Sequence, residues 1–83
     1  MLVFIALELP AGATAPAITA CDWEVGHPSD RDRVGPGVSS SDVDTERAIA
    51  ACRGYLETDP DNLRLQYQLA RAIVYQADRY GAS

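Results

Sequence analysis

The feature that most constrains this chain is a proline between two helix-forming stretches. Pro60 directly follows Asp59 and separates two segments whose apolar residues recur at helical spacing. Proline does not continue a helix, because it lacks an N–H group and its ring clashes with the preceding turn. This break predicts an all-α fold, a two-helix antiparallel hairpin over residues 42–83 that follows an irregular loop segment over residues 21–41.

The first predicted helix begins near residues 42–44. Ser41 or Asp42 is its expected N-cap, since the side-chain oxygen of either residue can accept from a free backbone N–H group. Acidic residues follow in the first turn, where the helix dipole favours them. The apolar positions of this helix form one stripe, which predicts a single buried face. These positions are Ala48, Ile49, Cys52, Tyr55 and Leu56.

The second predicted helix has Asp59 as its expected cap, starts between Pro60 and Leu63, and ends near Gln76 or Ala77. Its apolar residues cover two adjacent sides, and a helix of this kind needs a neighbour on each side. One side carries Leu65, Leu69, Ala72, Ile73 and Gln76, and the other carries Leu63, Tyr67, Ala70 and Val74.

Residues 1–20 differ in composition from the rest of the chain. An apolar run is followed by a stretch rich in small residues, in the order of a secretory signal peptide. No Lys or Arg precedes the run, and Glu8 lies at its end. We expect a signal peptide over residues 1–20 and a periplasmic or secreted protein; the alternative is a loosely packed apolar N-terminus. All seven basic residues are arginine, a bias typical of a GC-rich bacterial genome.

The chain has two cysteines, Cys21 and Cys52. In an exported chain an even cysteine count indicates a disulfide. Closing a loop of about 32 residues would stabilise a small domain by ~3–4 kcal/mol. Two alternatives stay open at this point. In a cytosolic chain both thiols would be free, and the tetrapeptide that ends at Cys21 also fits a lipid-attachment site, which would anchor the protein at a membrane.

Composition and motifs argue against several classes of function. A net charge of −5 without a basic tract is unsuited to nucleic acid or an anionic membrane surface. One histidine, His27, with Asp30 and Asp32 nearby is a weak metal or acid–base set, and we interpret it as a solvated turn. Cys52 lies on the predicted core face, where a thiol is inert. We therefore predict no enzymatic activity, no cofactor and no metal site.

The hairpin resembles the tetratricopeptide and related Sel-like helical repeats. Ala48, Asp59-Pro60, Leu69-Ala70 and Ala82 follow the pattern of these repeats, whose period is roughly 34 residues. More specifically, the chain is similar to the N-terminal segment of exported proteobacterial repeat proteins. The resemblance covers residues 44–82 and implies the second helix of one repeat followed by the first helix of the next.

The resemblance implies a protein–protein interaction module. Carried over to this chain, its groove residues are Arg64, Tyr67, Arg71 and Tyr75, with Val74 beside them. Two guanidinium groups flanking a tyrosine suit an acidic peptide segment, while the plainer interpretation is a solvated helix face. Because repeat modules need about three units for a continuous core, the alternative function is a truncated fragment or cap of a larger repeat protein. Self-association through the open apolar faces is a further expectation.

Overall fold

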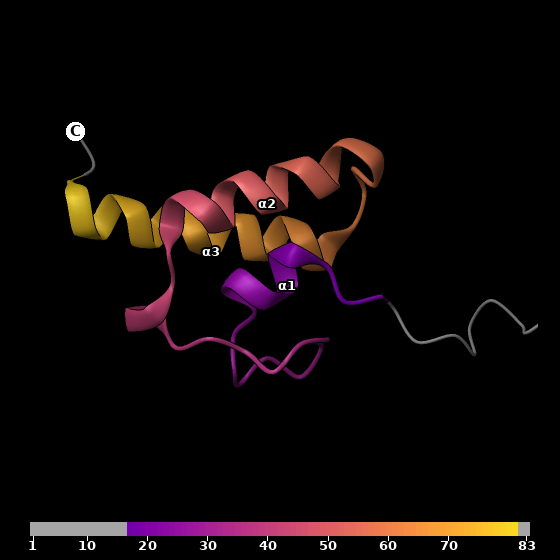
Figure 1. The fold of residues 1–83 in the computed structure, drawn as a ribbon, viewed down its shortest axis with the longest axis horizontal. Helices are drawn as coiled ribbons and strands as arrows, with labels where there is room; N and C mark the ends of the chain where they lie inside the picture. Colours follow the sequence, from indigo (N-terminus) through magenta and orange to yellow (C-terminus); the bar gives the residue numbers. More distant parts are fainter. Residues whose placement is uncertain (1–16, 82–83) are drawn as a thin grey trace, which may run out of the picture.

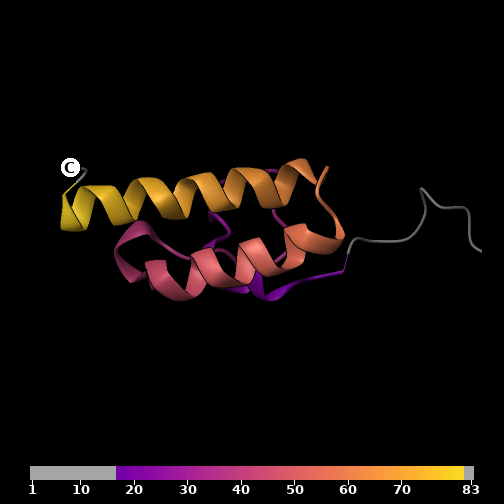
Figure 2. The same cartoon turned by 90° about the horizontal axis from the view of Figure 1, so that it is seen from above.

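The computed structural model describes residues 17–81, and its regular elements in that range are helical. They are α1 (Ala20–Val25), the short 3-10 turn η3 (Ser40–Asp42), α2 (Thr45–Thr58) and α3 (Leu63–Tyr80). The predicted all-α class is thus confirmed for the described residues. Helices α2 and α3 run antiparallel, and α1 packs against both of them (Figures 1 and 2).

The predicted signal peptide falls mostly outside the described residues, which begin at residue 17. Residues 17–20, which the prediction assigns to the leader, contain Thr19, the N-cap of α1. None of the helices in residues 17–81 has the length and apolar character needed to cross a bilayer.

The N-terminus of α2 lies slightly later than predicted. Asp44 is its N-cap, and the Asp44 carboxylate accepts from the backbone N–H of Arg47 at 3.1 Å. The predicted caps, Ser41 and Asp42, belong to η3 instead, where the Asp42 carboxylate accepts from the hydroxyl of Ser39 at 2.9 Å. The predicted cap was therefore wrong, because Ser41 and Asp42 are taken up by the preceding turn and Asp44 is the acidic residue that follows it.

The connection between α2 and α3 also differs in detail. Asp59, the predicted cap of α3, ends α2, because its backbone N–H donates to the carbonyl of Tyr55 at 3.1 Å. Asn62 is the N-cap of α3 and accepts from the N–H of Leu65 at 3.1 Å. The Asn62 amide also donates to the Asp59 carboxylate at 2.9 Å. Pro60 lies between the two caps, so it terminates one helix without entering the next.

Helix α3 continues to Tyr80, three to four residues beyond its predicted end. Arg79 in the last turn donates to the backbone carbonyls of Val43 and Ser40. These contacts hold the last turn of α3 against the segment that enters α2, which explains why the helix extends so far.

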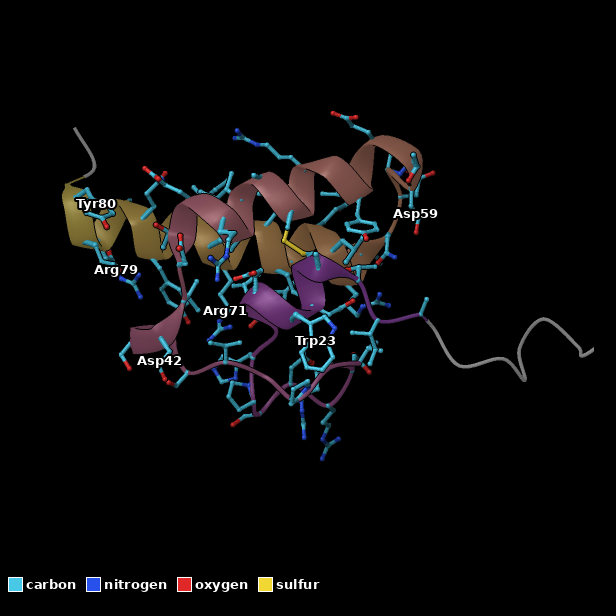
Figure 3. The ribbon with its side chains drawn as sticks, viewed as in Figure 1. Trp23, Asp42, Asp59, Arg71, Arg79 and Tyr80 are labelled. Atoms are coloured by element: carbon cyan, nitrogen blue, oxygen red, sulfur yellow. A yellow bond between two sulfur atoms is a disulfide. The ribbon has the colours of Figure 1, made fainter. Side chains whose placement is uncertain are left out.

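The core is small and lies where the three helices meet. Its fully buried apolar members are Cys21, Val25, Val43, Ala48, Cys52, Leu65 and Ala72. The sulfur atoms of Cys21 and Cys52 are bonded, with Cα atoms 4.6 Å apart, and this disulfide joins α1 to α2 (Figure 3). A sulfur in this bond is not available for acylation, so the structure supports the disulfide over a lipidated Cys21.

Residues 26–38 connect α1 to the segment before α2, and we call them the 26–38 loop. The backbone N–H of Val38 donates to the carbonyl of Gly26 at 2.6 Å and closes the base of the loop. Gly37 has φ = 91°, and a Cβ atom there would lie 2.5 Å from the Cα of Pro28. Only glycine fits this left-handed turn against a proline backbone. Of the predicted irregular segment 21–41, residues 21–25 are helical in α1 and residues 40–41 belong to η3, while the part between them is a loop with a defined path.

Candidate functional site

One side of α3 carries three arginines about two turns apart, Arg64, Arg71 and Arg79, which we call the arginine face. Arg64 forms a bidentate ion pair with Asp22 of α1. Its Nε lies 2.8 Å from Oδ1 and its Nη2 lies 3.2 Å from Oδ2. The Asp22 side chain is fully buried. This geometry matches the fork of a guanidinium group to a carboxylate and fixes α1 on α3.

Asp22 has a second structural partner in Thr19. The backbone N–H and the hydroxyl of Thr19 donate to Oδ2 of Asp22 at 2.8 and 2.9 Å, and the N–H of Asp22 returns a bond to the Thr19 hydroxyl. Burial on its own raises the pKa of Asp22, but the hydrogen bonds from Arg64 and Thr19 outweigh it and hold the pKa below the ordinary value. Asp22 is therefore ionised at neutral pH and acts as an internal anchor.

Arg71 is buried and donates only to neutral groups among the described residues. Its guanidinium reaches the carbonyl of Val25 at the end of α1, the carbonyl of Val38 at 3.0 Å and the hydroxyl of Tyr75 at 2.7 Å. Its Cζ lies 4.9 Å from the centroid of the Tyr75 ring. Arg71 thus ties both ends of the 26–38 loop to α3, and Figure 3 shows it between α3 and the N-terminal segment.

The four residues predicted to bind a partner lie in two different environments. Arg64, Arg71 and Tyr75 face α1 and the 26–38 loop, and their polar groups are engaged within the chain. Tyr67 lies beside Arg64 on α3, lines the same hollow as Arg64 and is 50% exposed. Their partner-binding role stays a prediction. What sequence reasoning missed is that the N-terminal segment covers the arginine face, so an acidic peptide would have to displace internal bonds.

The side of α3 next to the arginine face, about a quarter turn around the helix, is apolar and exposed, as the second apolar side of this helix predicts. Leu63, Tyr67, Ala70 and Val74 follow helical spacing along it, and we call this set the apolar stripe. The exposed fractions of the large side chains are 76% for Leu63, 50% for Tyr67 and 54% for Val74. Ile73 and Tyr80 extend the exposed apolar surface on the α2 side. Neither α1 nor α2 covers the stripe.

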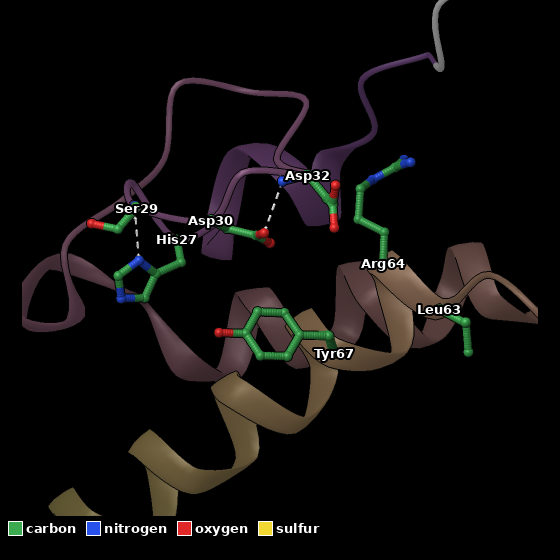
Figure 4. Close-up of a pocket in the computed structure, with 7 residues that line it drawn as sticks. All are labelled: His27, Ser29, Asp30, Asp32, Leu63, Arg64 and Tyr67. Atoms are coloured by element: carbon green, nitrogen blue, oxygen red, sulfur yellow. Dashed lines mark hydrogen bonds between the residues drawn. The ribbon is translucent and has the colours of Figure 1, made fainter.

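A hollow of about 730 Å³ lies at the N-terminal end of the apolar stripe, between α3 and the 26–38 loop (Figure 4). Its lining residues are His27, Ser29, Asp30, Asp32, Leu63, Arg64 and Tyr67. Leu63 and Tyr67 belong to both the hollow and the stripe, so the two form one continuous surface.

The loop side of the hollow is ordered by local hydrogen bonds. The N–H of Ser29 donates to Nδ1 of His27 at 3.0 Å, and the N–H of Asp32 donates to Oδ1 of Asp30 at 2.9 Å (Figure 4). Within residues 17–81 no three His, Cys, Asp or Glu side chains come together as ligands for a metal ion. The hollow therefore offers carboxylates and an aromatic face, not a metal cluster.

Asp22 and Thr19 are the structural residues that sequence reasoning did not single out. Thr19 and Asp22 have the three-residue spacing of a capping box, and this signal could have identified them. The spacing of Arg64, Arg71 and Arg79 places the three arginines on one face, which could have indicated a common role.

Comparisons with known protein families, with curated proteins and with solved structures find no match. The functional interpretation therefore follows from the geometry of α3 and its surroundings.

Proposed function

We propose that this chain binds another polypeptide, which lays a helix along the apolar stripe of α3. The observation that carries this proposal is the exposure of three large apolar side chains, Leu63, Tyr67 and Val74, in one row on a helix. Burying each of them contributes roughly 1.5–3 kcal/mol. Amphipathic helices bind their partners through apolar side chains at this spacing.

The covered side of α3 supports the same proposal, because it makes the stripe rigid. The disulfide holds α1 on α2, while the Arg64–Asp22 pair and Arg71 hold α1 and the 26–38 loop on α3. A surface that is already ordered loses less conformational entropy on binding. The internal contacts of the arginine face thus hold the neighbouring apolar stripe in an ordered form for association.

The resemblance to tetratricopeptide and Sel-like repeats supports a second candidate, the cap of a larger array of helical hairpins. The specific observation is asymmetry: one side of α3 is closed by the N-terminal segment, while the other is open and apolar. Capping units have one finished face and one face that stacks on a neighbour. In both candidates a helix occupies the stripe. In the first it belongs to a separate polypeptide, and in the second it belongs to the next hairpin of the array.

Export is part of the proposal. The Cys21–Cys52 disulfide is typical of proteins from oxidising compartments. A periplasmic or secreted location is consistent with the apolar, small-residue N-terminus, whose first sixteen residues lie outside the described range.

The proposal is tested with an amphipathic helical peptide of about 18 residues, the length of α3, with leucines on one face and glutamines on the other. Fluorescence anisotropy of the labelled peptide measures binding to the full chain. Val74→Asp places a charge in the stripe and should weaken binding at least about tenfold.

Gly54→Asp is the matched control, because a side chain at position 54 meets open space on α2. It should bind as the wild type does. Equal binding by the Val74→Asp variant and the wild type would contradict the role of the stripe.

A further inference from the structure

We infer that the polypeptide that occupies the apolar stripe is a cationic amphipathic helix, with an Arg or Lys side chain seated in the hollow at the N-terminal end of α3. This inference rests on the proposed function and specifies the charge of the partner. It reverses the acidic partner that Arg64 and Arg71 suggested from sequence.

The first step is that the positive charges of α3 are already used inside the chain. Arg64 is paired with the buried Asp22, and Arg71 is buried under three neutral acceptors. Arg79 donates to two backbone carbonyls near η3. Each arginine of α3 therefore has at least two of its three guanidinium nitrogens bonded within the chain, which leaves little for an acidic partner on the stripe.

The second step is that the hollow has negative charge to offer. Asp30 uses Oδ1 for the N–H of Asp32, which leaves its Oδ2 available. The carboxylate of Asp32 takes part in none of the hydrogen bonds or ion pairs among residues 17–81. Arg31 and Arg33, which alternate with the two aspartates, do not line the hollow. The Arg33 guanidinium donates to the backbone carbonyl of Asp30 at 3.3 Å, and none of the ion pairs among the described residues includes Asp30 or Asp32. Two carboxylates thus face the end of the stripe outside any ion pair.

The third step is that the walls of the hollow suit the stem of a basic side chain. Leu63 and Tyr67 form its apolar side, and the Tyr67 ring rises from α3 below the loop aspartates (Figure 4). Long basic side chains bury their methylene stems on apolar surface and keep the charged head polar. A guanidinium or ammonium group over a tyrosine ring gains further attraction. The hollow therefore combines an apolar wall with a negatively charged end.

A second copy of this chain fits the surface less well. Each copy has a net charge of −5 and presents the same two aspartates at the end of the same stripe. Like charges disfavour such a contact at low salt. A basic helix meets both the apolar and the electrostatic requirement, which is why we assign the surface to that class of partner.

The test uses the full chain in its oxidised form and three peptides of about 18 residues with identical leucine positions. Their polar positions carry arginine, glutamine or glutamate, and anisotropy is measured at about 50 mM and about 500 mM salt. We expect the arginine peptide to bind about tenfold more tightly than the glutamine peptide at low salt, the glutamate peptide to bind weakest, and the differences to shrink at high salt.

The variant Asp30→Asn/Asp32→Asn identifies the source of the preference. Asparagine at position 30 keeps the oxygen that accepts from the N–H of residue 32, so the loop is retained. This variant should lose the roughly tenfold preference for arginine and leave the affinity for the glutamine peptide unchanged. The control Glu46→Gln/Glu57→Gln removes the same charge from α2 and should keep the preference.

The outcomes separate this inference from the proposed function. Equal binding of all three peptides, weakened by Val74→Asp, would retain helix binding and overturn the cationic partner. Tightest binding of the glutamate peptide, or a dimer through the stripe in sedimentation at low salt, would overturn it as well. If none of the three peptides binds, both proposals are wrong.

Discussion

The arginine face and the apolar stripe of α3 differ in what covers them. The arginine face is covered by α1 and the 26–38 loop, and its guanidinium groups have partners inside the chain. The apolar stripe on the neighbouring side of the helix is exposed along its length. The same eighteen residues therefore serve as an internal scaffold on one side and as a free surface on the other.

In α3 the usual distribution is reversed, with charged side chains engaged inside the fold and large apolar side chains exposed. Arginines, which are mostly solvent-exposed in proteins, hold the fold together, because a planar fork with five donors can satisfy several acceptors at once. Large apolar side chains remain outside, and contiguous exposed apolar surface marks interaction sites. The candidate function therefore lies in the apolar side chains and carboxylates that the fold leaves uncovered, and not in the arginines that it uses internally.

Removing the disulfide tests the scaffold side most severely. The variant Cys21→Ala/Cys52→Ala should lose about 3–4 kcal/mol of unfolding free energy, because the bond no longer restricts the unfolded chain. Chemical denaturation followed by circular dichroism measures the loss. Reduction of the wild type should give a similar loss, and an unchanged midpoint after reduction would show that the bond contributes nothing.

Breaking the buried ion pair should have the next largest effect. Arg64→Met leaves the fully buried Asp22 without its guanidinium, and we expect a loss of about 2–3 kcal/mol. Arg53→Met is the matched control on α2, where the arginine is exposed, and should change the unfolding free energy by less than about 0.5 kcal/mol. Similar effects of both substitutions would contradict an anchoring role for Arg64.

Acid should weaken the same anchor. The pKa of Asp22 in the folded chain lies below its ordinary value of 3.8. Ionised Asp22 therefore contributes stability above that value, and the contribution is lost as the pH falls through the lower folded-state pKa. The difference in unfolding free energy between wild type and Asp22→Asn should be constant from about pH 7 to about pH 5 and shrink below 3.8. Asp61→Asn, in the exposed turn before α3, should show no such trend.

A charge in the apolar stripe should have the smallest effect on stability. Val74→Asp lies on an exposed position of α3 and should change the unfolding free energy by less than about 0.5 kcal/mol, while weakening peptide binding. A loss of stability comparable to that of Arg64→Met would show that the stripe is part of the core.

The sequence predicted the parts of this structure that depend on local pattern. Helical spacing and Pro60 indicate α2, α3 and the second apolar side of α3, and two cysteines in a chain with an apolar leader indicate the disulfide. The predicted caps, Ser41 or Asp42 for α2 and Asp59 for α3, were wrong, because η3 takes up the first two and Asp59 ends α2.

Local sequence pattern could not predict which residues cover the arginine face of α3. Asp22 and Arg64 are 42 residues apart, and Arg71 reaches residues 46 and 33 positions away. No periodicity relates these partners, because an irregular loop brings them together. For the same reason the sequence predicted a surface role for Arg64 and Arg71. The residues that cover these arginines lie in a segment rich in Gly, Pro and Ser, whose path no local pattern indicates.

A single NMR titration tests the contrast between the two faces most directly. The cationic peptide is added to the oxidised, ¹⁵N-labelled chain, and backbone amides and arginine side-chain Nε–H signals are followed in the same spectra. The account predicts shifts at Leu63, Tyr67, Ala70 and Val74, with the Nε–H signal of the buried Arg71, which does not line the hollow, protected from solvent and unmoved. A peptide-induced shift of the Arg71 signal, with the amides of the stripe unchanged, would contradict it.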